Sequence, residues 1–285
     1  MLVIYHGPAC SDGFSAAWAV KKAHPDAILH PATHGDNPPD VTGKDVVIVD
    51  FAYPRKVTER LIKEAKSFLL LDHHKTAMED LAGLPNCHFD MHRSGARMAW
   101  DYFHDNKPNP FMDYVQDQDL WLYSLPSSKQ VNAYIGSWHR KEEAWDFINA
   151  AIRDEPEYVA IQGQAIVNYQ ENLIYEAVKA AREVTIKQKN EGFFGWFWDF
   201  FDPLPSYNVL ITNCLGDFRS EVAARLAKDR PFAICWRQLK DGRYAYSLRA
   251  NKNSEYAIDL TDIAKQFGGG GHPTAAAFTA SKLLF

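Results

Sequence analysis

Two runs of apolar residues in the first third of the chain constrain its fold more than any other feature. They span Val46–Phe51 and Phe68–Leu71, and both are short. Such runs are typical of strands buried on both faces of a parallel sheet. The second run leads directly into Asp72, His73 and His74, at the kind of strand end where α/β sheets place their ligands. Burying an acid and two imidazoles is costly unless a metal ion or a phosphate pairs with them.

Segments with helical spacing separate the apolar runs, and this alternation predicts a parallel, doubly wound sheet. From about residue 111 to 182 the pattern is helical only, and a second α/β block follows. The expected strands are Leu2–Tyr5, Val46–Phe51, Phe68–Leu71, Tyr207–Thr212, Phe232–Trp236 and Tyr244–Arg249. The expected helices are Phe14–Ala23, Arg55–Lys66, Ser94–Asp105 with Ser94 as N-cap, Asp154–Arg182, Asp217–Lys228 and Ile258–Phe267.

The chain is therefore expected to form two α/β lobes. An N-terminal domain with the doubly wound parallel sheet would span residues 1–153, and a long helix in residues 154–190 would connect it to a smaller α/β domain at 191–285. A length of 285 residues agrees with about two domains.

Composition excludes several classes of protein. The formal net charge is −5 and the pI about 6.1, which argues against a broad basic face that binds long duplex nucleic acid. The four cysteines form no CxxC pair, so neither a zinc knuckle nor a disulfide framework is indicated. The sequence shows no signal peptide and no membrane-spanning apolar segment, so no membrane partner and a cytoplasmic location are expected.

One segment departs from this ordinary composition. Phe193–Phe201 holds seven aromatic residues in nine positions. Such a run suits packing between domains, a surface for a homodimer or another partner, or stacking on nucleotide bases. All three interpretations stay open.

Ionisable residues follow each of the first three predicted strands. His6 ends the first strand and is followed by Cys10 and Asp12, while Asp50 ends the second strand. Because parallel strands end at one edge of a sheet, these side chains should converge with His73 from the third. Imidazoles mixed with carboxylates suit manganese, zinc or iron. Asp50 is the natural candidate to bridge two ions ~3.5–4 Å apart, as in two-metal phosphoryl-transfer sites.

A run of four glycines, Gly268–Gly271, precedes His272 near the C-terminus. Consecutive glycines can point their amides into one concavity that binds an anion, to which His272 could add a donor. A flexible linker is the alternative interpretation.

Taken in order, these motifs resemble the DHH phosphoesterase superfamily. The resemblance is to the branch with the DHH-associated C-terminal domain, which includes RecJ-like exonucleases, nanoRNases and cyclic-dinucleotide phosphodiesterases. It covers nearly the whole chain. The matching residues are His6-x3-Cys10-x-Asp12-Gly13, Val49-Asp50, Asp72-His73-His74, and Gly268–His272 with Ser247-Leu248-Arg249 upstream.

The resemblance implies two manganese ions in a cleft between the lobes. The first would be held by His6 and Asp50, and the second by Asp12, Asp50, His73 and a later aspartate. Asp117 and Asp119 are the candidates for that aspartate, and Asp117 is preferred. The resemblance also implies roles in catalysis and substrate binding. His74 would contact the substrate phosphate, Asp72 would orient a ligand, and a terminal phosphate would bind Arg249, His272 and the amides of Gly270 and Gly271.

Two positions leave more than one interpretation. Cys10 stands where the family usually has an aspartate. A thiolate favours softer ions than manganese, so the first ion should bind weakly and the second tightly, giving one or two ions per chain. Arg93 precedes a helix start and could make a second phosphate contact, or Ser94 could simply cap that helix.

The expected activity is hydrolysis of phosphodiester bonds in short oligonucleotides or cyclic nucleotides by a water that the metal activates. A single-strand exonuclease of the RecJ-like type is the main alternative, and a pyrophosphatase fits less well. A non-catalytic nucleotide-binding regulatory module is the alternative from another class, and Cys10 is its best support.

Overall fold

The computed structural model describes residues 1–8, 10–187, 206–214, 218–251 and 258–285. The chain divides into two compact units, Met1–Asn168 and Tyr169–Phe285. Helix α8 (Pro156–Lys179) contains the boundary between them, close to the predicted connecting helix. The predicted domain boundary after residue 190 and the aromatic run Phe193–Phe201 lie outside the described residues, and the boundary after residue 153 stays a prediction.

The first unit is built on a five-stranded, entirely parallel sheet of order β2-β1-β3-β4-β5. The strands are β1 (Leu2–His6), β2 (Ile28–Ala32), β3 (Asp45–Val49), β4 (Ser67–Asp72) and β5 (Cys87–Phe89). The chain goes from β1 to its outer neighbour β2 and then returns to the other side as β3. The order therefore reverses between β1 and β3, which is where sheets of this kind commonly bind their ligands.

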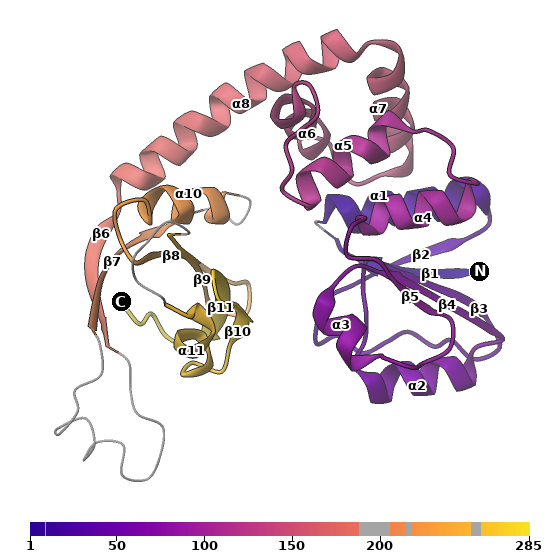
Figure 1. The fold of residues 1–285 in the computed structure, drawn as a ribbon, viewed down its shortest axis with the longest axis horizontal. Coiled ribbons are helices and arrows are strands. Elements are labelled where there is room, and N and C mark those ends of the chain that lie inside the picture. The colour runs from indigo at the N-terminus through magenta and orange to yellow at the C-terminus, as the bar shows by residue number, and fades with distance from the viewer. Residues whose placement is uncertain (9, 188–205, 215–217, 252–257) are drawn as a thin grey trace. The chain divides into compact units, whose positions relative to one another are not determined.

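Helices cover both faces of this sheet, as Figure 1 shows for α1 and α4 on one face and α2 on the other. The face with α1 and α4 carries the larger aromatic core, in which Trp18, Phe111 and Trp145 are at most 2% exposed. The helices of this unit are α1 (Ser11–Ala23), α2 (Arg55–Glu64), α3 (Lys75–Asp80), α4 (Gly95–Phe103), α5 (Pro110–Asp119), α6 (Ser128–Gly136) and α7 (Glu142–Asp154).

The second unit contains a six-stranded mixed sheet of order β10-β11-β9-β8-β7-β6, in which only β7 and β8 run parallel. Helix α10 (Arg219–Leu226) packs against β7 and β8, and α11 (Leu260–Lys265) packs against β9, β10 and β11. The strands are β6 (Arg182–Lys187), β7 (Ser206–Asn213), β8 (Phe232–Gln238), β9 (Tyr244–Ala250), β10 (Gly270–His272) and β11 (Ala275–Ala280).

The predicted fold class of two α/β lobes is confirmed, but five strands were not predicted. Strands β2 and β5 lie at the two edges of the first sheet. Strand β2 contains Pro31 and has one buried residue, and β5 has three residues, so neither forms an apolar run. Strand β6 is an exposed edge strand whose first residue, Arg182, was predicted to end the preceding helix, and β10 and β11 consist mainly of glycine and alanine. Among the described residues, no helix is long and apolar enough to cross a bilayer.

Candidate active site

The side chains predicted to converge at the strand ends of the first sheet do so around Asp50. Strand β3 lies between β1 and β4, so the residue that follows it has His6 on one side and His73 on the other. Asp50 Oδ2 lies 3.6 Å from His6 Nδ1, and Asp50 Oδ1 lies 3.2 Å from His73 Nε2. One carboxylate therefore faces two imidazoles with its two oxygens, as expected of a bridging ligand.

The backbone of Asp50 fixes this orientation. Its φ of 53° is left-handed, which is uncommon for a residue other than glycine, although aspartate tolerates it better than most. Its amide donates to the carbonyl of Leu71 on β4 at 3.0 Å, so the sheet interaction holds the residue after the strand has ended. Burial alone would raise the pKa of this carboxyl, but its interactions with His6 and His73 hold it well below the usual range.

A second group of carboxylates lies around His73. His73 Nε2 lies 3.5 Å from Asp119 Oδ2 at the end of α5 and 3.8 Å from Asp12 Oδ2 in the first turn of α1. The amides of Gly95 and Ala96 at the start of α4 donate to the two oxygens of Asp12, at 2.8 and 3.0 Å. Two helix N-termini, those of α1 and α4, thus meet at the carboxylates, where their partial positive charge is favourable.

The absence of a side chain at Gly95 allows the start of α4 to lie close to Asp50 and Asp12. A Cβ at this position would lie 2.4 Å from Asp50 Cβ and 2.9 Å from Asp12 Oδ2. Gly13, in the first turn of α1, has no room for a Cβ either, because it would lie 2.1 Å from the carbonyl oxygen of His6. Gly95 was not predicted as a site residue, although a glycine directly after a cap residue is a signal of close backbone approach.

The structure brings Asp119 into the cluster and leaves Asp117 out, so the preference for Asp117 does not fit the geometry. The carboxylate of Asp117 accepts hydrogen bonds from Ser124 N at 2.9 Å, Ser124 Oγ at 2.7 Å and Leu125 N at 3.3 Å, and so holds the turn after α5. Burial opposes its charge, but a hydrogen bond with Ser128 and then those with Ser124 and Leu125 lower its pKa. Asp119 Oδ2 is buried without a hydrogen-bond partner among the described residues.

This donor set fits a divalent cation. Three groups of potential ligands have their ligand atoms within 4.8 Å of one another, and Asp50 and His73 each belong to two of them. The pKa of Asp12 is raised well above its usual value by burial and by Asp50 and Asp119, and burial also raises the pKa of Asp119. Carboxylates that repel one another and an unpartnered carboxylate oxygen indicate a missing positive charge. The groups are Asp50, Asp72, His73 and His74; His6, Cys10 and Asp50; and Asp12, His73 and Asp119.

Cys10 has a structural role that its sequence position did not indicate. It is the N-cap of α1, and its Sγ accepts from the amide of Gly13 at 3.4 Å. The thiol donates to Asp50 Oδ2 at 3.5 Å. Burial and then the charges of Asp50 and Asp12 raise its pKa far above that of a free cysteine, so the thiol stays protonated as long as no cation lies beside it.

Asp72 and His74 form a pair next to the cluster. Asp72 is 1% exposed, and its Oδ1 accepts from His74 Nδ1 at 2.7 Å and from the amide of His73 at 2.8 Å. The hydrogen bond to Asp72 raises the pKa of His74. The ring of His74 is half-exposed. Asp72 thus orients His74 through its ring and His73 through its backbone.

Arg93 does not join these residues. Its guanidinium donates to Asp90 at 2.7 Å and to Asp101 at 3.1 Å, so two carboxylates already pair with it. Ser94 caps α4, since its Oγ accepts from the amide of Arg97 at 3.3 Å. The helix start donates to Asp12 instead of presenting free amides to a phosphate.

In the second unit, the glycine run does not form the predicted four-amide nest. The amides of Gly268 and Gly269 donate to the carbonyls of Lys265 and Ala264 and end α11. Gly270 and Gly271 belong to β10 and pair with β11. Gly271 has a φ of 143°, and a Cβ there would lie 2.5 Å from the carbonyl oxygen of Ala275, so the fold itself requires glycine here.

Arg249 and His272 share a face of the second sheet. Arg249 pairs with Ala275, which in turn pairs with His272, so the two residues occupy one row across three strands. Neighbouring strands are ~4.8 Å apart, which places the two backbones ~10 Å from each other with a small alanine between them. Arg249 donates to Ser220 Oγ at 2.8 Å, and burial and the charge of Arg219 lower its pKa.

Comparisons with known proteins agree with this architecture. Residues 219–283 match the DHHA1 domain. The uncharacterized protein R106 of Acanthamoeba polyphaga mimivirus is 29% identical over 307 residues, covering 98% of this chain and 67% of that protein.

Among solved structures, the pGpG-specific phosphodiesterase PggH from Vibrio cholerae is similar with a TM-score of 0.53 and 12% identity, over 98% of this chain and 92% of that one. This similarity shows a shared fold. A protein from Helicobacter pylori G27 is also similar, with a TM-score of 0.47 and 14% identity, over 99% of this chain and 93% of that one.

Proposed function

We propose that the chain, whose residues 219–283 match the DHHA1 domain, belongs to the DHH phosphoesterase superfamily and is a manganese-dependent phosphodiesterase acting on short oligonucleotides or cyclic nucleotides. The observation that carries the proposal is the position of Asp50, whose two oxygens face His6 and His73 in two separate ligand groups. His6 and Asp50 would hold one ion, and Asp12, Asp50, His73 and Asp119 the other.

A divalent ion at such a site lowers the pKa of a water and neutralises charge on phosphoryl oxygens. The residues of the chain have their own parts in this chemistry. With Nδ1–H directed to Asp72, His74 is protonated more readily, and its Nε2–H is then available to donate to a phosphate oxygen. Asp72 is the positioning residue, because it fixes the ring and favours its charged form.

The second unit would bind a terminal phosphate of the substrate through Arg249, His272 and the one amide of Gly270 and Gly271 that faces away from β11. Arg249 has no carboxylate partner among the residues that the structure describes, and Ala275 leaves space between it and His272. An arginine and an imidazole on one sheet face suit a terminal phosphate. His272 is exposed and so accessible to such a group.

Cys10 determines how many ions the site holds. A protonated Cys10 that caps α1 supplies no ligand to a cation, and the first metal site then has only His6 and Asp50 as ligands. We expect metal analysis after extensive dialysis to find about one Mn²⁺ per chain. Two tightly held ions would show that Cys10 is deprotonated and ligates, or that a further ligand completes the first site.

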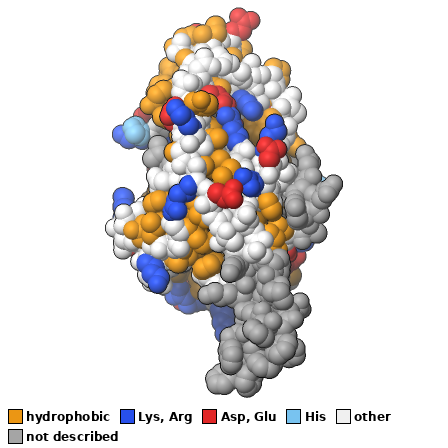
Figure 2. Space-filling model, turned by 90° about the vertical axis from the view of Figure 1, so that its left-hand side faces the viewer, with side chains coloured by type: hydrophobic (Ala, Val, Ile, Leu, Met, Phe, Trp, Pro, Cys, Tyr) orange, Lys and Arg blue, Asp and Glu red, His pale blue; other side chains and the backbone are white. Residues whose placement is uncertain are grey.

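A single-strand exonuclease is the second candidate. It would need a broad basic surface, whereas on the face that Figure 2 presents the Lys and Arg side chains are scattered among hydrophobic and other residues, with a few Asp and Glu near them. The net charge of −5 also favours short substrates.

A panel of substrates tests the proposal. The protein is incubated with Mn²⁺ and, separately, with 5′-phosphorylated dinucleotides, cyclic mono- and dinucleotides, pyrophosphate and a long labelled single strand. We expect hydrolysis of the small nucleotides, and His73→Ala and Asp50→Asn should abolish it while the circular dichroism spectrum is unchanged. Rapid cleavage of the long strand with neglect of dinucleotides would favour the exonuclease. Binding of nucleotides without any cleavage would favour the regulatory module.

A further inference from the structure

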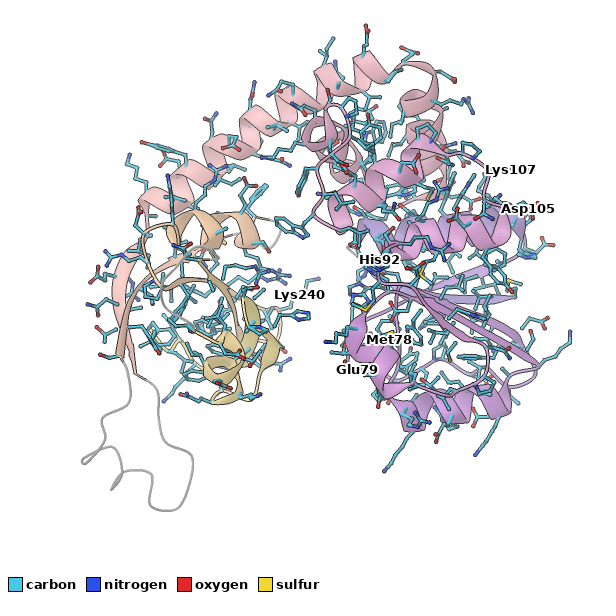
Figure 3. All side chains as sticks on the ribbon, in the orientation of Figure 1. Met78, Glu79, His92, Asp105, Lys107 and Lys240 are labelled. Atoms are coloured by element: carbon cyan, nitrogen blue, oxygen red, sulfur yellow. The ribbon has the colours of Figure 1, made fainter. Side chains whose placement is uncertain are left out.

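A pocket of about 300 Å³ opens in the first unit directly beside His74. Three segments line it: the loop after β2, the segment after β3, and the end of β4 with α3. Figure 3 places Met78 and Glu79 of α3 at the same edge of the unit as His92, whereas Asp105 and Lys107 lie beyond the far end of α4. The lining residues are His34, Phe51, Ala52, Tyr53, Pro54, Asp72, His74, Thr76, Ala77 and Asp80.

Aromatic rings connect this pocket to the candidate metal ligands. The ring of Phe51 stacks on that of His6 with centroids 6.3 Å apart, and it packs against His34 at 5.1 Å and edge-on against Tyr53 at 4.9 Å. Phe51 and Tyr53 are 2% and 4% exposed, and His34 is exposed. The pocket thus has a rigid aromatic floor and an accessible imidazole at its rim.

The polar groups of the pocket also point to a ligand. The hydroxyl of Tyr53 and Asp72 Oδ2 are both buried, and neither has a hydrogen-bond partner among the described residues. Buried polar groups are nearly always paired, so such atoms beside a pocket indicate a group that is absent from the free protein. Burial, with a contribution from Asp36, raises the pKa of Tyr53 to about 12, so its hydroxyl stays protonated and can donate.

The charges of the lining residues restrict what this group can be. The lining contains two carboxylates, Asp72 and Asp80, and neither lysine nor arginine. A second phosphate would meet Asp72 and Asp80 with only the imidazoles of His34 and His74 to offset them, which disfavours the chain of a polyphosphate. A flat, neutral group with hydrogen-bonding atoms fits, and the volume lies at the lower end of the range for small-molecule sites, enough for one nucleoside.

We propose that this pocket binds the base of the nucleoside attached to the scissile phosphate, against the exposed ring of His34 and within reach of Tyr53. The inference rests on the proposed function and narrows its substrate class, because it requires a substrate with a base, which pyrophosphate and polyphosphate lack. His34 and Tyr53 are then specificity residues and not catalytic ones.

The test compares three dinucleotides as substrates with Mn²⁺: the intact molecule and two versions that lack the base of the 5′ or of the 3′ nucleoside. For the wild type, loss of one of the two bases should lower kcat/KM by about 5- to 150-fold, the range of stacking on an aromatic side chain. His34→Ala should lower kcat/KM for the intact dinucleotide by a similar factor and should leave hydrolysis of that base-free substrate unchanged.

Two further variants complete the design. Tyr53→Phe should lower kcat/KM only for substrates that carry the base, whereas a merely unpaired hydroxyl would give a more stable protein with unchanged kinetics. His88→Ala, an exposed histidine outside the pocket, is the matched control and should behave as wild type.

The outcomes separate the two claims. If the wild type cleaves all three dinucleotides within about twofold, or if the His34→Ala effect is equal on all of them, the pocket does not bind a base, although the enzyme is a phosphodiesterase. If the wild type cleaves no dinucleotide, the proposed function is wrong and this inference is wrong with it.

Discussion

Replacing Gly95 by alanine tests the geometry of the metal cluster more directly than removing a ligand, because it adds one methyl group and removes no charge. The new Cβ would lie 2.4 Å from Asp50 Cβ, 3.0 Å from Asp50 Cα and 2.9 Å from Asp12 Oδ2. Non-bonded carbon atoms normally approach to ~3.5–4.0 Å, so the start of α4 or Asp50 must move by about 1 Å or more. A shift of that size breaks the 2.8 Å hydrogen bond from the Gly95 amide to Asp12.

The expected cost follows from these terms. Overpacking a buried position costs about 1–3 kcal/mol, and a hydrogen bond to a charged group contributes about 1.5–3 kcal/mol. The higher helix propensity of alanine offsets at most about 1 kcal/mol of this loss in the free energy of unfolding. We expect a net loss of about 2–4 kcal/mol in the first unit, which is a fall of roughly 4–16 °C in Tm for a unit of this size. Affinity for Mn²⁺ should fall by about 10- to 100-fold, as when the support of a metal ligand is removed.

Calorimetric unfolding and Mn²⁺ titration of the metal-free protein measure both effects. Gly136→Ala is the matched control, because Gly136 ends α6 on the surface and a Cβ there meets no atom within 4 Å. It should leave Mn²⁺ affinity unchanged and alter stability by less than about 1 kcal/mol. If Gly95→Ala keeps its Tm within about 1 °C of wild type and binds Mn²⁺ within twofold, the close approach of α4 to the carboxylates is refuted.

Three further predictions concern the same unit. Asp119→Asn should abolish tight Mn²⁺ binding and raise the Tm of the metal-free protein, because it removes one of several carboxylates that repel one another. Asp117→Asn should lower Tm with little change in Mn²⁺ affinity, because Asp117 holds the turn after α5. The reverse pattern would contradict the choice of Asp119 as the ligand. Gly163→Ala should destabilise the unit by about 1–3 kcal/mol in thermal unfolding, since its Cβ would lie 1.9 Å from the carbonyl oxygen of Gln130. Burial and neighbouring carboxylates raise the pKa of Asp12, and carboxylate neighbours outweigh burial to raise that of His73 to about 9. The folded metal-free protein thus holds protons that the unfolded chain releases, so its Tm should fall as the pH rises from about 6.5 to 9. Saturating Mn²⁺ should reverse this trend. A Tm that rises over this range without metal would contradict the prediction.

Much of the first unit could be predicted because its signals are strong and local. Val46–Phe51 and Phe68–Leu71 are buried on both faces, and the polar residues that follow them identify the edge of the sheet where they meet. The mixed second sheet was predicted less completely, because strands such as Gly270–His272 and Ala275–Ala280 have no apolar run and depend on their neighbours for definition.

The choice between Asp117 and Asp119 shows why the site could not be completed from sequence. Two residues apart on a helix, they point in nearly opposite directions, and either could face the cluster. Which one does depends on the turn after α5, where Ser124 and Leu125 donate to Asp117. The glycine run has the same difficulty, since a requirement for φ > 0 at Gly271 and an anion-binding nest both call for glycine.

The position of His34 has a consequence for how proteins of this kind can diverge. The cluster around Asp50 stands on strand ends and helix starts that the core holds in place, whereas His34 lies in the loop between β2 and β3. Insertions or replacements in that loop cost the fold little. With the base bound at His34 as proposed, substrate preference could therefore change between lineages, or be re-engineered in the laboratory, while the candidate metal cluster stays the same.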